Sequence, residues 1–185
     1  MLLPGLVAVG QTRKRHRRVR RQSVGIGYTR AEWPPAKDSL FYKFTVALPT
    51  VDRLEIYKLD KLYIATEEDG IAIPQAGRAH VAASMTLTGP DAERLAKTWR
   101  ALQQGAGSGC FAPGFYLKFF SSGQLLLETS VCFGCSNLTL MNEAGTTETW
   151  GFAKAGSSGQ ALLSALNEII PRPPKPIQKV NNPLD

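Results

Sequence analysis

The sequence predicts an α+β fold in which two helices pack on a mainly antiparallel sheet. Short aromatic and β-branched runs, separated by turn residues, outnumber the helical patterns. No regular alternation of strand and helix patterns demands a parallel sheet. The chain has 185 residues, of which 43% are hydrophobic, and this is enough for one domain with its own core. We expect that domain to span residues 40–170, between a basic arm with a linker (1–39) and a proline-rich tail (171–185).

The N-terminal arm carries the excess positive charge of the chain. Of the 22 Lys and Arg residues, seven crowd into this arm: Arg13, Lys14, Arg15, Arg17, Arg18, Arg20 and Arg21. The remaining 15 balance the 15 Asp and Glu residues, so the rest of the chain is formally neutral. Like-charge repulsion favours an extended, disordered arm. Such an arm suits nucleic acid or an anionic membrane surface, and the alternative is a leader without a binding role.

The order of segments at the N-terminus does not match a secretory signal. An apolar stretch, residues 1–10, precedes the basic run, whereas a signal peptide places positive charge first. The stretch is also too short for a bilayer, which takes about 20 apolar residues. The sequence therefore predicts neither a signal peptide nor a transmembrane helix, and it assigns no compartment.

Strand patterns fill the first half of the predicted domain. We expect strands over residues 40–48, 53–59, 62–66 and 79–88, with a turn at Asp60-Lys61 and a solvated acidic loop over residues 67–70. A helix should begin after residue 88, because Thr88 or Gly89 can cap it and Pro90 suits its first turn. Its apolar face would consist of Ala92, Leu95, Ala96, Trp99 and Leu102.

Residues 110–135 form the predicted core hairpin. Two apolar runs, 115–120 and 125–133, flank the turn-forming residues 121–124. With a three-residue loop at 122–124, strand parity pairs Lys118 with Glu128 on one face. On the other face it pairs Phe119 with Leu127, Leu117 with Thr129 and Phe115 with Val131. The same register brings Cys110 close to Cys135.

All three cysteines, Cys110, Cys132 and Cys135, lie in this hairpin and should be neighbours if residues 133 and 134 form a turn. A disulfide from Cys110 to Cys132 or Cys135 would close the hairpin base and leave one thiol over. A zinc site would need a fourth ligand, for which His80 is the only histidine outside the arm. Inert buried thiols are a third interpretation. A catalytic thiol is disfavoured, because a strand pattern and not a helix follows the C-x-x-C segment.

The last elements are two strands and a helix. Strands are expected over residues 137–141 and 146–152, and Ser157 or Ser158 should cap the helix. Pro171 stops that helix, whose apolar side comprises Leu162, Leu163, Leu166, Ile169 and Ile170. The tail over residues 171–185 suits a protein partner, or it is an exposed terminus.

The hairpin pattern C-F-x-P, a Phe-rich strand, a glycine turn and C-F-x-C resembles a motif of uncharacterised bacterial proteins, often envelope or secreted ones. The resemblance covers residues 110–135 and implies bacterial origin and export, but no activity. No Ser-His-Asp order, H-E-x-x-H motif or phosphate loop occurs, so we predict no catalytic residues and no cofactor, with zinc as the alternative. The sequence thus favours a non-enzymatic bacterial binding or structural module with a cysteine-stabilised core hairpin. The alternative is a thiol-dependent redox or metal-binding protein.

Overall fold

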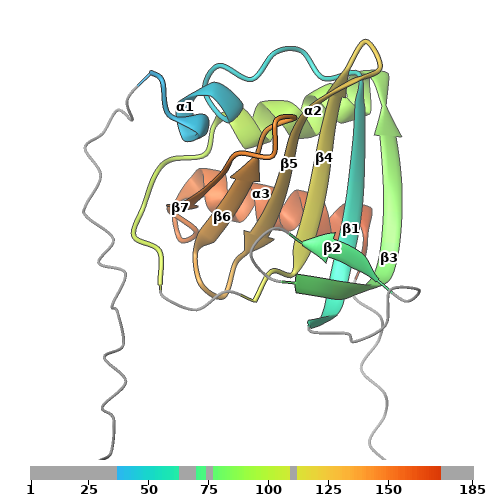
Figure 1. Ribbon diagram of the computed structural model, residues 1–185, viewed down its shortest axis with the longest axis vertical. Coiled ribbons are helices and arrows are strands. Elements are labelled where there is room, and N and C mark those ends of the chain that lie inside the picture. Colours follow the sequence, from blue (N-terminus) through green and yellow to red (C-terminus); the bar gives the residue numbers. More distant parts are fainter. Residues whose placement is uncertain (1–36, 63–69, 74–76, 109–111, 172–185) are drawn as a thin grey trace, which may run out of the picture.

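The computed structural model describes residues 37–62, 70–73, 77–108 and 112–171. Seven antiparallel strands form one curled sheet in the order β2-β3-β1-β4-β5-β6-β7. The helices α2 and α3 lie side by side on one face of this sheet, and the short α1 lies near its β7 edge (Figure 1). The predicted α+β class with a mainly antiparallel sheet is confirmed. The elements are α1 (Leu40–Phe44), β1 (Arg53–Leu62), β2 (Ile71–Ile73), β3 (Gly77–Thr88), α2 (Gly89–Arg100), β4 (Phe115–Ser121), β5 (Gln124–Cys132), β6 (Asn137–Met141), β7 (Thr147–Gly151) and α3 (Ser157–Ile169).

The main core lies between the sheet and the two long helices. Trp99 of α2 is fully buried, lies 5.2 Å from the ring of Phe119, and donates its indole N–H to the carbonyl oxygen of Phe44 at 2.6 Å. The predicted apolar face of α2 is therefore the buried one, and Pro90 stands in its first turn as expected. The residues that fill this core from the sheet and the helices include Leu54, Ile56, Leu117, Phe119, Leu127, Leu138, Leu140, Ala92, Leu95, Ala96, Leu162 and Leu166.

The β4–β5 hairpin has the predicted register, with Lys118 opposite Glu128 and the three expected pairs on its apolar face. Its loop is shorter than predicted. Ser121 pairs with Gln124, so only Ser122 and Gly123 turn the chain, and a bulge between Phe119 and Phe120 absorbs the extra residue. Both loop residues have positive φ, 50° and 80°, which is the primed turn whose twist matches that of the strands.

Residues 40–48 were expected to form a strand, and this expectation is wrong. Residues Leu40–Phe44 form α1, because the Ser39 hydroxyl caps the segment by accepting the backbone N–H of Tyr42 at 3.1 Å. Phe41 is completely buried and its ring lies 5.5 Å from that of Trp150. The aromatic residues that indicated a strand are thus used to pack one helical turn against the sheet.

Two further boundaries differ from the predictions. No turn forms at Asp60-Lys61, because β1 continues to Leu62 and takes up register shifts around Leu59. The helix α3 is capped by Gly156, with no side-chain cap bond from the serines that follow. The strand predicted over residues 62–66 and the acidic loop over 67–70 fall almost entirely outside the described residues.

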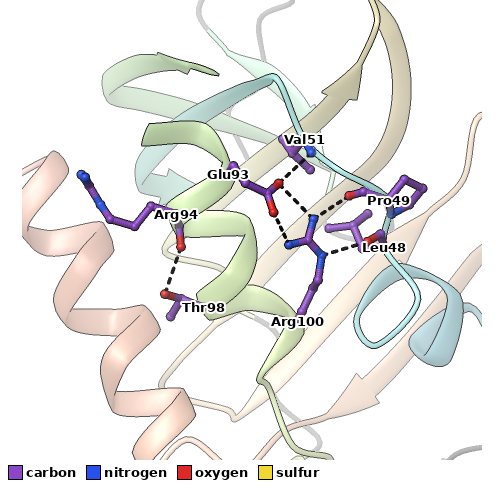
Figure 2. Close-up of polar contacts among 7 residues, drawn as sticks. All are labelled: Leu48, Pro49, Val51, Glu93, Arg94, Thr98 and Arg100. Carbon is purple, nitrogen blue, oxygen red and sulfur yellow. Dashed lines mark hydrogen bonds and ion pairs between the residues drawn. The ribbon is translucent and has the colours of Figure 1, made fainter. Parts of the chain in front are cut away.

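The segment before β1 is fastened to α2 by one ion pair (Figure 2). The Arg100 guanidinium donates to the carboxylate of Glu93 at 2.7 and 3.1 Å and to the carbonyl oxygens of Leu48 and Pro49 at 2.8 and 2.7 Å. The same carboxylate accepts the backbone N–H of Val51 at 2.9 Å. Two side chains of one helix therefore satisfy three backbone groups of an otherwise irregular segment.

The glycine-rich segment before β4 runs along the end of β7. The Gly105 N–H donates to the Gly151 carbonyl oxygen at 3.0 Å, and Gln104 forms an isolated bridge with Phe152. A Cβ atom on Gly151 would lie 2.3 Å from the carbonyl oxygen of Gly105 and from the backbone nitrogen of Gly107, so only glycine permits this approach. The segment covers the end of the β7 edge.

Candidate functional site

The turn between β5 and β6 brings two of the predicted cysteines together. Cys132 ends β5, residues 133–136 form the turn, and the Cys135 N–H donates to the Cys132 Sγ at 3.1 Å. Both side chains are buried, and Cys132 carries a free thiol. Cys110 lies outside the described residues, but Ser108, two residues before it, donates its N–H to the Cys135 carbonyl oxygen at 2.9 Å. The chain leading to Cys110 is therefore held beside Cys135.

His80 lies apart from the cysteines. It stands on β3, where its Nδ1 is 2.7 Å from an Oδ1 of Asp60, and both side chains are more than 40% exposed. The strands β1 and β4 separate β3 from β5, a distance of about 14 Å or three strand spacings. Two ligands of one zinc ion lie about 4 Å apart. Among the described residues no three His, Cys, Asp or Glu side chains converge on a metal-sized site.

The remaining predicted sites belong to the ends of the chain. The basic residues of the arm, Arg13 to Arg21, and the tail beyond Pro171 lie outside the described residues. Within the described ranges, no helix combines the length and the apolar character that a bilayer crossing requires.

Two rows of polar side chains cross the sheet face that α2 and α3 leave free. In the first, the charged row, Glu55 of β1, Lys118 of β4 and Glu128 of β5 stand in register. In the neighbouring hydroxyl row, every position from β3 to β7 bears a hydroxyl: Ser84, Tyr57, Tyr116, Ser130, Thr139 and Thr149. Strand alternation places both rows opposite the main core, so the sheet has one apolar face and one polar face.

A cleft lies over the meeting point of these rows. The strand β2 pairs only with the start of β3 and crosses in front of the sheet, where Ile73 packs in a small second core with Tyr116, Leu59 and Ala79 (Figure 1). The cleft has a volume of about 470 Å³. Its lining consists of Tyr57, Ile71, Ala72, Ile73, Tyr116, Lys118, Glu128 and Met141.

The electrostatics of the cleft centre on Glu128. Burial, and then the negative charge of Glu55, raise the pKa of the Glu128 carboxyl. The Tyr116 hydroxyl donates to its Oε2, and the Lys118 ammonium is 3.7 Å from its Oε1. Burial and a hydrogen bond to Glu55 raise the pKa of Tyr57 to about 12. The environment of Glu128 therefore disfavours its charged form even though Lys118 pairs with it, and Glu55 itself pairs with Arg53 at 3.7 Å.

The aromatic rings give the cleft a surface that attracts cations. The ammonium of Lys118 lies 5.8 Å from the centre of the Tyr116 ring, and the rings of Tyr57 and Tyr116 are 6.2 Å apart. Carboxylates beside electron-rich ring faces attract organic cations, and apolar side chains favour the carbon chain that carries such a cation. The arrangement can bind an amine more readily than an anion.

Another hollow, of about 550 Å³, lies between α2 and α3. Its charged residues include Asp91 and Arg94, which pair with each other at 2.9 Å on the exposed side of one helix. Thr98 donates to the carbonyl oxygen of Arg94 within the same helix (Figure 2). These polar groups of α2 satisfy one another.

Sequence reasoning found one pair of the site and missed the rest. The pairing of Lys118 with Glu128 follows from the local hairpin register. Glu55 and Tyr57 join them through the pairing of β1 with β4. The Glu55–Lys118 pair is 63 residues apart in the chain, and the Tyr57–Tyr116 pair is 59 residues apart. Alternation along each strand was a usable signal, but no local pattern fixes which distant strands pair. Comparison of the chain with protein-family models, curated proteins and solved structures finds no match.

Proposed function

We propose that the chain is a non-enzymatic binding module that holds an organic cation in the cleft between β2 and the helix-free sheet face. One observation carries this proposal: the Glu128 carboxylate is largely buried beside a second carboxylate, and its pKa is raised. A ligand cation close to Glu128 would favour the ionised form of this carboxyl. The chemical class is a primary or methylated ammonium on a short apolar chain, such as a lysine side chain.

The two tyrosines and β2 support the same ligand class. Tyr57 and Tyr116 present ring surface, while Ile71, Ile73 and Met141 supply an apolar wall for methylene groups. The volume of about 470 Å³ is within the range of small-molecule sites and exceeds what one side chain fills. The ligand would displace the Lys118 ammonium from Glu128 or share the carboxylates with it.

The test compares two probes that differ in charge. Nα-acetyl-lysine amide and its neutral analogue Nα-acetyl-norleucine amide are titrated into the full-length protein and followed by NMR chemical shifts. Only the lysine derivative should bind, with shifts at Tyr57, Tyr116 and Glu128. The variant Glu128→Gln should weaken binding by about tenfold, since it removes a buried charge. Glu143→Gln, in the exposed β6–β7 turn, is the matched control.

The pH dependence gives an independent readout. A cation prefers the ionised carboxylate, so affinity should rise as pH rises through the elevated pKa of Glu128, and binding should release a proton in that range. Equal binding of both probes, or a Glu128→Gln variant that binds as well as the native chain, contradicts the cation site.

We also propose that a disulfide between Cys110 and Cys135 stabilises the base of the core hairpin. The support is the Ser108–Cys135 backbone hydrogen bond, because Cys110 follows Ser108 by only two residues, or at most about 7 Å of chain. A disulfide needs Cα atoms about 4.4–6.8 Å apart. Cys132 would remain the single thiol.

Thiol counting in denaturant tests this pairing. Without reductant, one thiol per chain should react, and with reductant all three cysteines should react. Peptide mapping should join residues 110 and 135. Three thiols without reductant would instead favour inert cysteines, and stoichiometric zinc in the purified protein would favour the metal-binding alternative.

A further inference from the structure

Over most of its length, the outer edge of β3 has no strand partner among the described residues. β2 pairs with only Gly77, Arg78 and Ala79 of β3, although β3 continues to Thr88. A register shift leaves Ala82 bulged, and from residue 83 to residue 88 the strand runs in regular register with β1. No described element lies beside this part of β3 (Figure 1). The backbone N–H and C=O groups on the outer side of residues 83–88 therefore pair with no described strand.

This edge lacks the features that usually keep sheet edges apart. Residues 83–88 read A-S-M-T-L-T, with neither a charged residue nor a proline. Ser84, Met85, Thr86 and Thr88 are exposed, and Met85 is 45% exposed. Only Val46 among the other described residues is a large hydrophobic with comparable exposure. Soluble proteins protect open edges with charges, prolines, bulges or covering segments, and in the described part of the chain the bulge at Ala82 is the only such device.

We propose that this edge is a dimer interface, at which β3 pairs antiparallel with β3 of a second copy of the chain. The pairing would join two seven-stranded sheets into one continuous sheet around a two-fold axis. The inference goes beyond the proposed cation site and does not depend on it, because the cleft is lined by other strands.

The side chains of β3 are complementary to themselves. Ala83, Met85 and Leu87 share the helix-bearing face, since they stand opposite Lys58, Ile56 and Leu54 in register. Ser84, Thr86 and Thr88 share the other face. Antiparallel pairing always places residues of the same face opposite each other, so the apolar row would meet its own copy and the hydroxyl-bearing residues would meet theirs.

The charge balance favours a second copy as the occupant. A strand without charged residues meets its copy without repulsion, whereas an edge bearing charges of one sign would oppose its own copy. The start of α2 at Gly89 turns the chain away from the sheet and limits the paired length to about six residues. So short an interface predicts a weak, concentration-dependent dimer.

Sedimentation velocity of the full-length protein from about 1 μM to 1 mM tests the proposal, a range that covers weak association. The native chain should pass from monomer to dimer as concentration rises. Met85→Lys places like charges opposite each other and should weaken the dimer by about tenfold or more. Val46→Lys changes an equally exposed hydrophobic away from β3 and should dimerise like the native chain.

Hydrogen exchange locates the interface and guards against misfolded variants. Backbone amides of residues 83–88 should become more protected as the native protein is concentrated, and Met85→Lys should remove this change while its circular dichroism and unfolding midpoint remain native. A native chain that stays monomeric throughout the range overturns the proposal. A dimer that Met85→Lys leaves intact also overturns the proposal, because it would show that the copies associate through a different surface.

Discussion

At the scale of single residues, Arg100 makes the contacts on which the segment before β1 most depends. Its guanidinium reaches one carboxylate and two carbonyl oxygens at once, and its side chain is only 21% exposed. Lysine retains the charge but not the planar arrangement of donors. We expect Arg100→Lys to lower the free energy of unfolding by about 1–3 kcal/mol, the usual cost of unpaired buried polar groups.

Urea denaturation measures this change, and Arg94→Lys is its control on the same helix. Arg94 pairs with Asp91, but the two side chains are 77% and 59% exposed. Exposed pairs contribute little, so this variant should differ from the native protein by less than about 0.5 kcal/mol. Equal effects of the two substitutions would show that the Arg100 bonds do not hold the segment.

Glu128 should make the stability depend on pH. Its folded-state pKa is raised above the ordinary value of 4.5 by burial and by Glu55. A raised pKa means that the contribution of this group is fully present below about pH 4.5 and is lost as pH rises through the folded-state pKa. Glu128→Gln cannot ionise, so its stability relative to the native chain should increase as pH rises from about 4 to 8.

Chemical denaturation of both proteins across this pH range gives the comparison. Glu143→Gln serves as the control, because Glu143 lies in an exposed turn. A constant difference between Glu128→Gln and the native protein would contradict a raised pKa.

At the scale of secondary-structure elements, the β4–β5 turn determines how the hairpin closes. Ser122 and Gly123 both have positive φ, and a Cβ on Gly123 would meet no atom within 4 Å. Gly123→Ala should therefore cost only the backbone strain of a left-handed residue, about 1–2 kcal/mol. Ser122→Asn should be neutral or stabilising, because Asn-Gly is the preferred pair in this turn.

Thermal unfolding of the two variants tests the two-residue turn. Gly123→Ala should lower the unfolding midpoint, whereas Ser122→Asn should leave it unchanged or raise it. A three-residue loop, as the sequence suggested, would not require this left-handed pair. Substitutions of equal effect at both positions would contradict the two-residue turn.

The elements that could be predicted from the sequence are those with local signals. The start of α2 at Thr88 and Pro90 and the register of Phe115 with Val131 follow from neighbouring residues, although the Thr88 side chain makes no cap bond. The segment Leu40–Phe44 could not be assigned, because its aromatic residues fit a strand equally well and the Ser39 cap and the contact with Trp150 decide the helix. The charged row needed the pairing of β1 with β4, which is not local.

At the scale of the whole molecule, the charge is unevenly distributed along the chain. Seven basic residues precede residue 22, and the rest of the sequence is formally neutral. If the arm binds nucleic acid, its affinity should fall steeply with salt, with a slope of about 0.9 per neutralised phosphate on logarithmic axes. We expect deletion of residues 1–22 to abolish DNA binding at both low and moderate salt.

Fluorescence anisotropy with a labelled duplex at two salt concentrations measures the effect. A variant with the seven basic residues replaced by glutamine retains the length of the arm but not its charge. It therefore separates the effect of the charge from that of the length. Unchanged affinity after the deletion would rule out the arm as the binding element.

The β7 edge and the β3 edge of the sheet are built differently, and this difference limits how many copies of the chain can associate through them. At β7, the backbone of Gly105 occupies hydrogen-bonding positions at Gly151, and α1 lies alongside the same strand. At β3, no described strand pairs with the outer side of residues 83–88. A protein with two free margins would polymerise into a filament, whereas one with a single free margin has no place for a third subunit. If the proposed dimer forms, substitution of Gly151 would thus affect more than local packing, since it would displace the backbone that covers the end of β7.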